Sequence, residues 1–552
     1  MTKKGKLPGN KVIICLTAIV TIGAFLRFWN IGAESLRLDE AQSIWQATHT
    51  LEFIRLYTLK NVHLPLHNTF LHFWITLFGS KETAIRISSA VFGVLILPAL
   101  YLLSREFLKK KWALFATAVG AISPIWIWYS REIRMYTLLT FVTTLSYYFF
   151  LRILRTNKLK YYIFYSMTNL AGIYIHYFFL LVLLTQAVFF LSTWKIKWNS
   201  KEILSKKKVF YNFLIIAAIL LIFFSPWLYA FIRSHGSGTY APELDKPSSF
   251  NIILSFFEFN FGYQPENVTS VLIAFWPLII LTGFIFLSKR NPINPSIYLT
   301  ITGTILPVFL TFMVSILYRP VYLTRYLIII TPLYYIFITW VLAESKGISQ
   351  KVLTIILLGA LGASLANQYT SSEIAVKENY REAVNYISEN TNPRDIVALA
   401  PPYMIYPLQY YYRGPAKITS FPIWDKRKGA IPDFTPKRLA EDTQIIKTGH
   451  RRIFLFMAED LKGGLDAKNY LDSKFTKLEK KQFSKTLWLN VYQSEYEPNE
   501  YVYEVKNGDT LSSIAFQFYQ DYLLFKVIAE ANNIENPNLI RTGFPLAIPE
   551  IN

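Results

Sequence analysis

Long apolar runs recur through the first two-thirds of the chain and are separated by short polar connections. A transmembrane α-helix needs about 20 predominantly apolar residues to cross the hydrocarbon core of a bilayer. The pattern therefore predicts a multi-pass α-helical membrane protein with about eleven transmembrane helices. The runs lie near 11–31, 83–104, 112–129, 135–154, 161–175, 177–194, 209–232, 268–287, 297–317, 323–343 and 351–367.

The connections between these runs carry the charge asymmetry that sets membrane orientation. Cytoplasmic loops of membrane proteins carry an excess of Lys and Arg. Basic clusters fall on alternate connections, at 105–111, 152–160, 195–208 and 289–290. This alternation places the N-terminus inside and, with an odd helix count, the C-terminus outside. The stretch 161–194 is compatible with one long helix or with two that turn at His176. The odd total number of helices that the alternation requires favours two.

The N-terminal region resembles a signal peptide, because lysines precede the first apolar run. The stretch 17–31 offers no convincing small-residue cleavage site and many apolar runs follow, so we expect an uncleaved first helix. The connection that follows, at about 32–82, is long and rich in polar and aromatic residues. Its segments 40–58 and 66–78 have helical apolar spacing, which predicts interfacial helices that lie along the membrane.

Composition supports a membrane location. Hydrophobic residues make up 53% of the chain and charged residues 17%, against a charged share of roughly 25% in soluble domains. The net charge of +21 is compatible with nucleic acid, anionic lipid or the positive-inside rule. Because the basic clusters alternate between loops, we expect the lipid bilayer and no nucleic acid as partner. The single cysteine, Cys15, lies in the first apolar run and excludes intrachain disulfides and Cys-based metal sites.

The hydrophobicity falls to that of soluble protein after about residue 368. The stretch 380–388 has the pattern of an amphipathic helix, and 395–399 and 452–457 have that of buried strands. This alternation predicts an extracytoplasmic α/β domain. We therefore expect three domains, at 1–368, 369–499 and 500–552.

The C-terminal segment carries the most specific local pattern. Its expected elements are a strand at 502–505, a helix capped by Asp509 or Thr510 that ends near Phe518, a helix at 522–531 and a strand at 546–548. This βααβ order, with its motifs, resembles the LysM module over the whole length of the segment. The motifs are Gly508-Asp509-Thr510-Leu511, Ile514-Ala515, Ala531-Asn532-Asn533, Asn536-Pro537-Asn538-Leu539-Ile540, Gly543 and Ile548-Pro549.

The LysM resemblance implies binding of peptidoglycan or another glycan that contains N-acetylglucosamine. The groove would lie between the first turn and the loop after the second helix, with Leu511 and Ile540 covering the acetamido methyl group. Its residues would be Gly508, Asp509, Thr510, Leu511, Asn538, Leu539 and Ile540. The chain departs from the family at Phe544-Pro545, where Gly and a polar pair are usual. A module that merely caps the C-terminus remains the alternative.

Adjacent carboxylates follow the first helix in the segment RLDEAQSIWQ, which contains Arg37, Asp39 and Glu40. Carboxylates beside a bilayer are costly to desolvate, so they tend either to be functional or to lie in water. The alternative interpretation is a solvated helix start with Asp39 as the N-cap. The neighbouring segments favour a functional role.

Two further segments place arginines at outer helix ends, where the positive-inside rule does not expect them. SPIWIWYSREIRMYTL contains Arg131, Glu132 and Arg134, and YRPVYLTRYL contains Arg325 and Tyr326. Arginine offers forked donors and a permanent charge, as a lipid phosphate requires. An internal pair of Glu132 with Arg131 or Arg134 is the alternative.

These segments, with HLPLHNTFLHFWITLFG and ETAIRISSAVFGVL, resemble the bacterial GT-C glycosyltransferases. That branch includes protein O-mannosyltransferase-like and aminoarabinose-transferase-like enzymes, and the resemblance covers most of residues 10–345. The family's Tyr-Ser-x-Glu-x-Arg-Met-Tyr pattern matches the stretch 129–136 and carries over Glu132 and Arg134. Its His-Pro-Pro-Leu is here His63-Leu64-Pro65-Leu66, which loosens the turn but keeps His63.

The resemblance implies transfer of a sugar from a polyprenyl-phosphate donor to an acceptor on the outer face of the cell membrane. Asp39 would be the base with Glu40 as its neighbour, and Glu132 would be the third catalytic residue. Arg134 and Arg325 would hold the donor phosphate. The full donor-binding set would be Arg37, His63, Arg131, Arg134, Tyr136, Arg325 and Tyr326.

Two other functional classes fit parts of this pattern. A transporter or flippase of lipid-linked glycans, tethered to the wall, would use the same outer arginines. Transporters, however, concentrate polar residues at the midplane of broken helices and contain internal repeats, and we find neither pattern. The third class, an inert wall anchor, does not explain why carboxylates and arginines lie together at the outer surface. His63 and His67 have helical spacing, but Pro65 intervenes and spacing identifies no further ligand, so we assign no metal site and leave a divalent metal requirement open.

Overall fold

The computed structural model describes residues 9–549 except 61–62, 195–205, 235–243, 267, 271–294, 372–373, 375–377, 427–430, 462 and 495–500. It forms two compact units, which we describe separately. One unit comprises Met1–Ala33 and Ser43–Val376, and the other comprises Glu34–Gln42 and Lys377–Asn552. The division into domains at 1–368, 369–499 and 500–552 stays a prediction.

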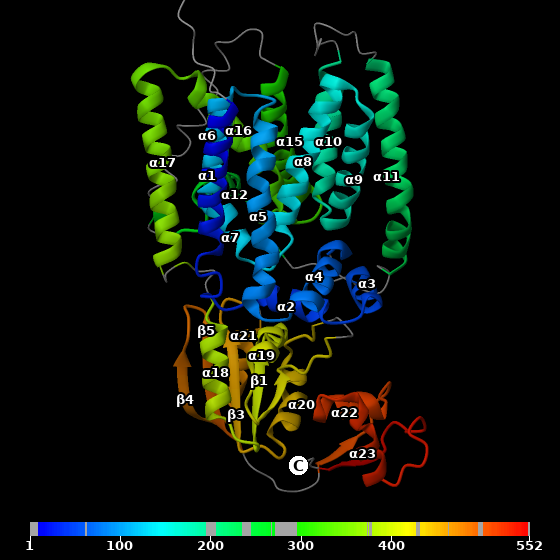
Figure 1. The fold of residues 1–552 in the computed structure, drawn as a ribbon. Coiled ribbons are helices and arrows are strands. Elements are labelled where there is room, and N and C mark those ends of the chain that lie inside the picture. Colours follow the sequence, from blue (N-terminus) through cyan, green and yellow to red (C-terminus); the bar gives the residue numbers. More distant parts are fainter. Residues whose placement is uncertain are drawn as a thin grey trace, which may run out of the picture. The chain divides into compact units, whose positions relative to one another are not determined.

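The first unit is a bundle of helices (Figure 1). Among the described residues, seven helices are long and apolar enough to cross a membrane, or eight if α6 and α7 form one bent span. The membrane helices are α1 (Gly9–Phe28), α5 (Glu82–Ser104), α6 (Lys110–Ala121), α7 (Pro124–Ser130), α8 (Tyr136–Thr156), α11 (Lys206–Ser234), α15 (Pro295–Leu317), η2 (Thr324–Ile330), α16 (Thr331–Glu344) and α17 (Gly347–Thr370). Shorter helices are α2 (Leu38–Ala47), α3 (Leu51–Leu59), α4 (Pro65–Phe78), α9 (Leu159–Ile175), α10 (Phe179–Ser192) and α12 (Ser249–Phe261).

The multi-pass helical fold is confirmed, whereas the count of about eleven spans stays a prediction. Most of the predicted run 268–287 lies outside the described residues, as does the basic cluster 289–290. The stretch 161–194 forms two helices, α9 and α10, because the chain is extended at His176 (φ −157, ψ 136). The predicted interfacial helix 40–58 is also divided, since Thr50 caps a separate α3 by accepting a bond from the Phe53 N–H.

The predicted span 112–129 is broken, because α6 and α7 meet at an angle of 55°. Pro124 occupies the start of α7 and cannot donate a backbone hydrogen bond, while Ser123 before it is extended. The guanidinium of Arg27 in α1, which is fully buried, supplies donors at the break. It donates to the carbonyl oxygens of Gly120 (3.1 Å) and Ala121 (2.9 Å).

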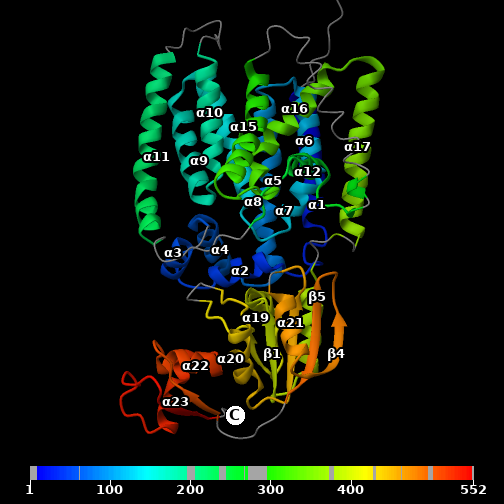
Figure 2. The ribbon, with the colours of Figure 1, turned by 180° about the vertical axis from the view of Figure 1, so that it is seen from behind.

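Two of the predicted basic connections lie together at one end of the bundle. Arg152 and Arg155 of α8 form ion pairs of 3.4 and 3.1 Å with Glu106, which follows α5. The helices α3 and α4 lie across the opposite end (Figures 1 and 2). The described basic residues at 105–111 and 152–160 thus share one face, as the alternation of charge predicts.

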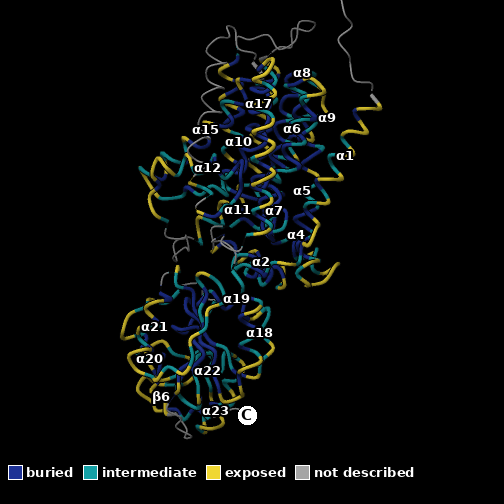
Figure 3. The backbone as a smooth tube through the Cα atoms, turned by 90° about the vertical axis from the view of Figure 1, so that its left-hand side faces the viewer, coloured by how far each residue is buried: buried dark blue, intermediate teal, exposed yellow. Residues whose placement is uncertain are grey.

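The second unit contains an α/β fold with a five-stranded mixed sheet of order β2-β1-β3-β5-β4. Strand β1 is parallel to β2 and β3, and β5 is antiparallel to β3 and β4. The strands are β1 (Asp395–Ala400), β2 (Lys417–Ser420), β3 (Arg452–Ala458), β4 (Thr476–Gln482) and β5 (Leu487–Gln493). The helices are α18 (Tyr380–Asn390), η3 (Pro402–Met404), α19 (Ile405–Tyr411), α20 (Pro436–Lys447) and α21 (Gly464–Asp472). Strands β1, β3 and β5 are mostly buried, whereas β4 alternates between exposed and half-buried residues. Figure 3 shows buried residues in the middle of this unit and exposed ones around its periphery.

The same unit ends in the predicted βααβ module. Its elements are β6 (Tyr501–Glu504), α22 (Leu511–Tyr519), η4 (Tyr522–Leu524), α23 (Phe525–Ala531) and β7 (Pro545–Ile548). Thr510, not Asp509, caps α22. Gly508 has a φ of +87°, a left-handed conformation that strains other residues. The helix predicted at 522–531 is present as α23, and the 3₁₀ helix η4 forms its start.

Candidate functional site

The turn between α7 and α8 buries two charged side chains. Glu132 and Arg134 are 4% and 6% exposed. Buried charges are costly unless they are hydrogen-bonded. Arg134 Nη1 donates to Ser43 Oγ at 3.0 Å, and Nη2 lies 3.4 Å from Nε2 of His63. The structure thus brings His63 and Arg134 together and adds Ser43 to them.

Arg325 joins this group from the start of η2. Arg134 and Arg325 both act electrostatically on the Tyr136 hydroxyl and on His176. The ring centroids of Tyr326 and His176 lie 4.8 Å apart. The guanidinium of Arg325 lies 5.7 Å from the Tyr326 ring centroid. Segments far apart in the sequence therefore form one arginine-rich cluster at the end of the bundle where α8 begins.

The Tyr136 hydroxyl is a buried donor within this cluster. Tyr136 is 1% exposed, and its hydroxyl has no hydrogen-bond partner among the described residues. Glu132 also acts electrostatically on it. A hydroxyl that lies within the electrostatic reach of two guanidinium groups suits an anion that carries several acceptor oxygens, such as a phosphate.

Aromatic residues that the sequence analysis did not single out form one wall beside Tyr136. The ring of Tyr129 lies 4.6 Å from that of Tyr136, and its hydroxyl is 2.6 Å from that of Tyr263. Glu132 acts electrostatically on Tyr129 as well. Tyr129 lies inside the matched motif, whereas no sequence signal distinguishes Tyr263 from the chain's many other tyrosines.

Arg131 makes its contacts elsewhere, although we predicted it to bind the donor. Its Nη2 donates to the Asn30 carbonyl at 2.8 Å, and its guanidinium lies 4.9 Å from the Tyr369 ring centroid. It therefore ties the end of α1 to α17. The contacts of Arg131 explain its position without a ligand, so we do not carry it into the proposed site.

The histidines of the first outer connection do not share a helix. His63 precedes α4, which begins at Pro65, and His67 lies inside it. Burial, aided by the charge of Arg134, lowers the pKa of His67 to about 3, so its imidazole is neutral. Within the part of the chain that the structure describes, no group of three or more His, Cys, Asp or Glu side chains could hold a metal ion.

The predicted acidic residues Asp39 and Glu40 belong to the first turn of α2, within the second unit. The helix begins at Leu38, so Asp39 is not its N-cap. Glu40 instead accepts a 2.8 Å hydrogen bond from the Arg37 N–H, which is half of a capping box. Glu40 is therefore a capping residue, and Asp39 is half-buried in the same turn.

The predicted glycan groove is partly exposed. Gly508, Thr510 and Asn538 are exposed, Leu539 is 74% exposed and Ile540 is half-buried. Asp509 accepts hydrogen bonds of 2.8 Å from the Tyr503 hydroxyl and the Lys506 N–H, so it holds the turn. Leu511 is only 1% exposed, and our prediction that its side chain covers a ligand's methyl group is wrong because that side chain fills the core.

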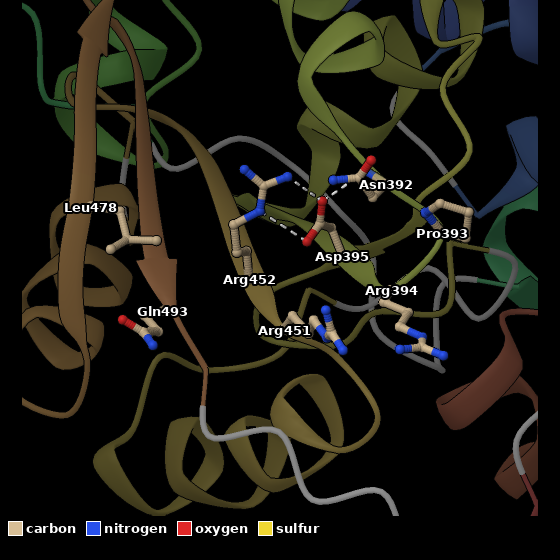
Figure 4. Close-up of a pocket in the computed structure, with 8 residues that line it drawn as sticks. All are labelled: Asn392, Pro393, Arg394, Asp395, Arg451, Arg452, Leu478 and Gln493. Carbon is tan, nitrogen blue, oxygen red and sulfur yellow. Dashed lines mark hydrogen bonds and ion pairs between the residues drawn. The ribbon is translucent and has the colours of Figure 1, made fainter.

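A separate pocket of about 620 Å³ lies at the amino ends of β1 and β3. Figure 4 shows Arg452 paired with Asp395, while Arg394 and Arg451 point away from that pair. The shortest Arg452–Asp395 distance is 2.6 Å. Ligands of open α/β sheets bind at the carboxyl ends of the strands, so we assign this pocket no catalytic role.

Comparison with known proteins finds two family matches and a shared fold. Residues 62–229 match the family model described as dolichyl-phosphate-mannose-protein mannosyltransferase, and residues 503–549 match the LysM domain. ArnT from Cupriavidus metallidurans shares the fold. The TM-score is 0.56 and the identity 11% for the apo state, over 87% of this chain and 98% of that chain. For ArnT bound to undecaprenyl phosphate the TM-score is 0.52 and the identity 12%, over 88% of this chain and 98% of that chain.

The chain is therefore a multi-pass helical membrane protein that shares the fold of ArnT. It contains a segment that matches the mannosyltransferase family model and a C-terminal segment that matches the LysM domain. An uncharacterized protein of Deinococcus radiodurans is 54% identical over 48 residues, which are 9% of this chain. The match covers only 19% of that relative's length.

Proposed function

We propose that this protein transfers a sugar from a polyprenyl-phosphate-linked donor to an acceptor on the outer face of the membrane. The observation that carries the proposal is the electrostatic influence of both Arg134 and Arg325 on the buried Tyr136 hydroxyl, which has no hydrogen-bond partner among the described residues. The ArnT structure with bound undecaprenyl phosphate has the same fold. A lipid phosphate supplies the multiply charged oxygens that such a cluster suits.

In the proposed reaction, an acceptor hydroxyl or amine attacks the anomeric carbon of the donor sugar. The bond between that carbon and the phosphate oxygen breaks, and its electron pair stays on the phosphate. Arg134 and Arg325 hold the phosphate and stabilise the charge that it gains, while the Tyr136 hydroxyl donates a further hydrogen bond. In-line attack inverts the anomeric centre.

Asp39 takes the proton that the acceptor loses. It precedes Ser43, the partner of Arg134, by one turn of α2. Glu132 offsets the charge of the arginines when no donor is bound. His63 orients Arg134, and Tyr326 packs beside Arg325.

The LysM domain binds peptidoglycan or a related N-acetylglucosamine glycan and so keeps the enzyme near the cell wall. This role requires the second unit to lie outside the cell membrane, with the N-terminus inside. The paired basic connections after α5 and α8, at the end of the bundle away from Tyr136, support this orientation. Protease added to intact spheroplasts should remove the chain beyond residue 370, and full protection would contradict the orientation.

Transfer can be measured in membranes that contain the protein and a radiolabelled polyprenyl-phosphate sugar. We expect the label to leave the lipid fraction in the wild type and to stay there in an Arg134→Ala, Arg325→Ala double variant. Release must also depend on an added acceptor fraction. Movement of intact labelled lipid between leaflets, without loss of the sugar, would instead indicate a flippase.

A further inference from the structure

The segment Glu34–Gln42, which carries Asp39, is fastened to the α/β fold of the second unit. Ser35 makes two of the contacts. Its hydroxyl lies 3.1 Å from the carbonyl oxygen of Glu378, to which it donates, and 3.0 Å from the Tyr380 N–H, from which it accepts. One side chain therefore joins this segment to the first turn of α18.

Two more hydrogen bonds hold the backbone on either side of Ser35. The Leu36 N–H donates to the Tyr411 hydroxyl at 2.7 Å, and Leu36 is fully buried. Arg381 Nη2 donates to the Glu34 carbonyl at 3.0 Å. Leu36 lies three residues before Asp39, so these bonds fix the backbone directly before the first turn of α2.

Charged side chains of the segment and of the α/β fold influence one another electrostatically. Arg37, Asp460 and Asp39 all act electrostatically on Glu378. Asp460 follows β3, so it lies at the carboxyl end of a parallel strand pair. This is the end of an open α/β sheet where functional sites form. The α/β fold thus presents its functional end to the segment that contains Asp39.

We propose that the α/β fold is a positioning part of the transferase site, because it holds the Asp39 segment through hydrogen bonds that involve Ser35, Tyr411 and Arg381. This inference rests on the proposed function, since it assumes that Asp39 takes the acceptor's proton. The α/β fold is then required for turnover even though it contributes no group that takes the proton. A misplacement of about 1 Å at a reacting group lowers rates by roughly a hundredfold.

The variant Tyr411→Phe tests the proposal, because it removes one hydroxyl and keeps the ring. Tyr386→Phe is a matched control, since the Tyr386 hydroxyl makes a 2.7 Å bond to Glu479 in the same fold. Neither tyrosine belongs to the proposed donor-binding set. We expect Tyr411→Phe to lower kcat by roughly three- to tenfold, the equivalent of one hydrogen bond, with an unchanged KM for the donor. The control should match the wild type.

Ser35 provides a second comparison. Ser35→Ala removes both contacts of the side chain and should lower kcat, whereas Ser35→Thr keeps the hydroxyl and should restore much of it. A merely destabilised protein would lose folded material without a change in kcat per folded molecule. Equal kcat values for the wild type, Tyr411→Phe and Ser35→Ala would overturn the proposal.

Hydrogen exchange gives a measurement that does not depend on activity. The peptide that covers 34–42 should exchange faster in full-length Tyr411→Phe than in the wild type or in Tyr386→Phe. Unchanged exchange would overturn the fastening, whatever the assay shows. Asp39→Asn separates the general-base role of Asp39 from the positioning role of the α/β fold. If Asp39→Asn is active, both roles are refuted together. An inactive Asp39→Asn with a fully active Tyr411→Phe refutes the positioning role alone.

Discussion

Replacing Arg134 by alanine should weaken donor binding more than any other single change in the cluster. The side chain is 6% exposed, and its known contacts are a 3.0 Å bond to Ser43 and a 3.4 Å approach to His63. If it also grips the donor phosphate, its loss removes a charge-assisted contact worth about 1.5–3 kcal/mol. Because about 1.4 kcal/mol is tenfold in affinity, donor binding should weaken by roughly 10- to 150-fold. Lysine keeps the charge but not the forked pair of donors, so the donor affinity of Arg134→Lys should lie between those of the wild type and Arg134→Ala.

The assay is equilibrium binding of a polyprenyl phosphate to purified protein in nanodiscs. Arg131→Ala is the matched control, since Arg131 lies three residues away but contacts Asn30 and Tyr369. It should leave the donor Kd unchanged. An unchanged Kd for Arg134→Ala, or an equal loss for Arg131→Ala, would refute the assignment of the phosphate to Arg134.

Three further changes have distinct signatures. Asp39→Asn should lower kcat by roughly 10²- to 10⁴-fold, the usual contribution of a general base, while the donor Kd survives; unchanged turnover would exclude Asp39. Gly508→Val should weaken pull-down of the full-length protein by insoluble peptidoglycan, because valine strains a φ of +87°; equal binding would place the groove elsewhere. Burial raises the pKa of Glu378 from 4.5 to about 7. The folded state therefore disfavours the ionised carboxyl, and the destabilisation grows as pH rises from about 4.5 through 7. Glu378→Gln should accordingly raise Tm near pH 8 and leave it unchanged near pH 4, and a uniform shift would contradict this origin.

Sequence patterns predicted the membrane helices well, because hydropathy depends only on local composition. The predicted run 83–104 corresponds to α5 at Glu82–Ser104, and 297–317 to α15 at Pro295–Leu317. The break at Ser123 was missed although Pro124 signals it, because an apolar run continues through the bend. In the α/β fold, β4 was missed because this edge strand contains mostly polar residues. Hydrophobic periodicity cannot identify such a strand.

The candidate site was only partly predictable, because its members meet through tertiary structure. Arg131 and Arg134 have the same chemistry in the sequence, and only the turn after α7 sends them in different directions. Tyr263 and His176 carry no motif of their own, so their place beside the cluster needs coordinates. Leu511 shows the reverse error, since a conventional LysM position led us to expect a surface role for a core residue.

The contact between Arg27 and the break after α6 has a consequence for membrane insertion. The carbonyl groups of Gly120 and Ala121 accept from the Arg27 guanidinium, and a backbone group left without a partner in hydrocarbon costs several kcal/mol. The bent pair of α6 and α7 therefore depends on α1 for two of its backbone hydrogen bonds in lipid. Since α1 precedes α6 in the chain, this partner is already synthesised when the turn that carries Glu132 and Arg134 emerges.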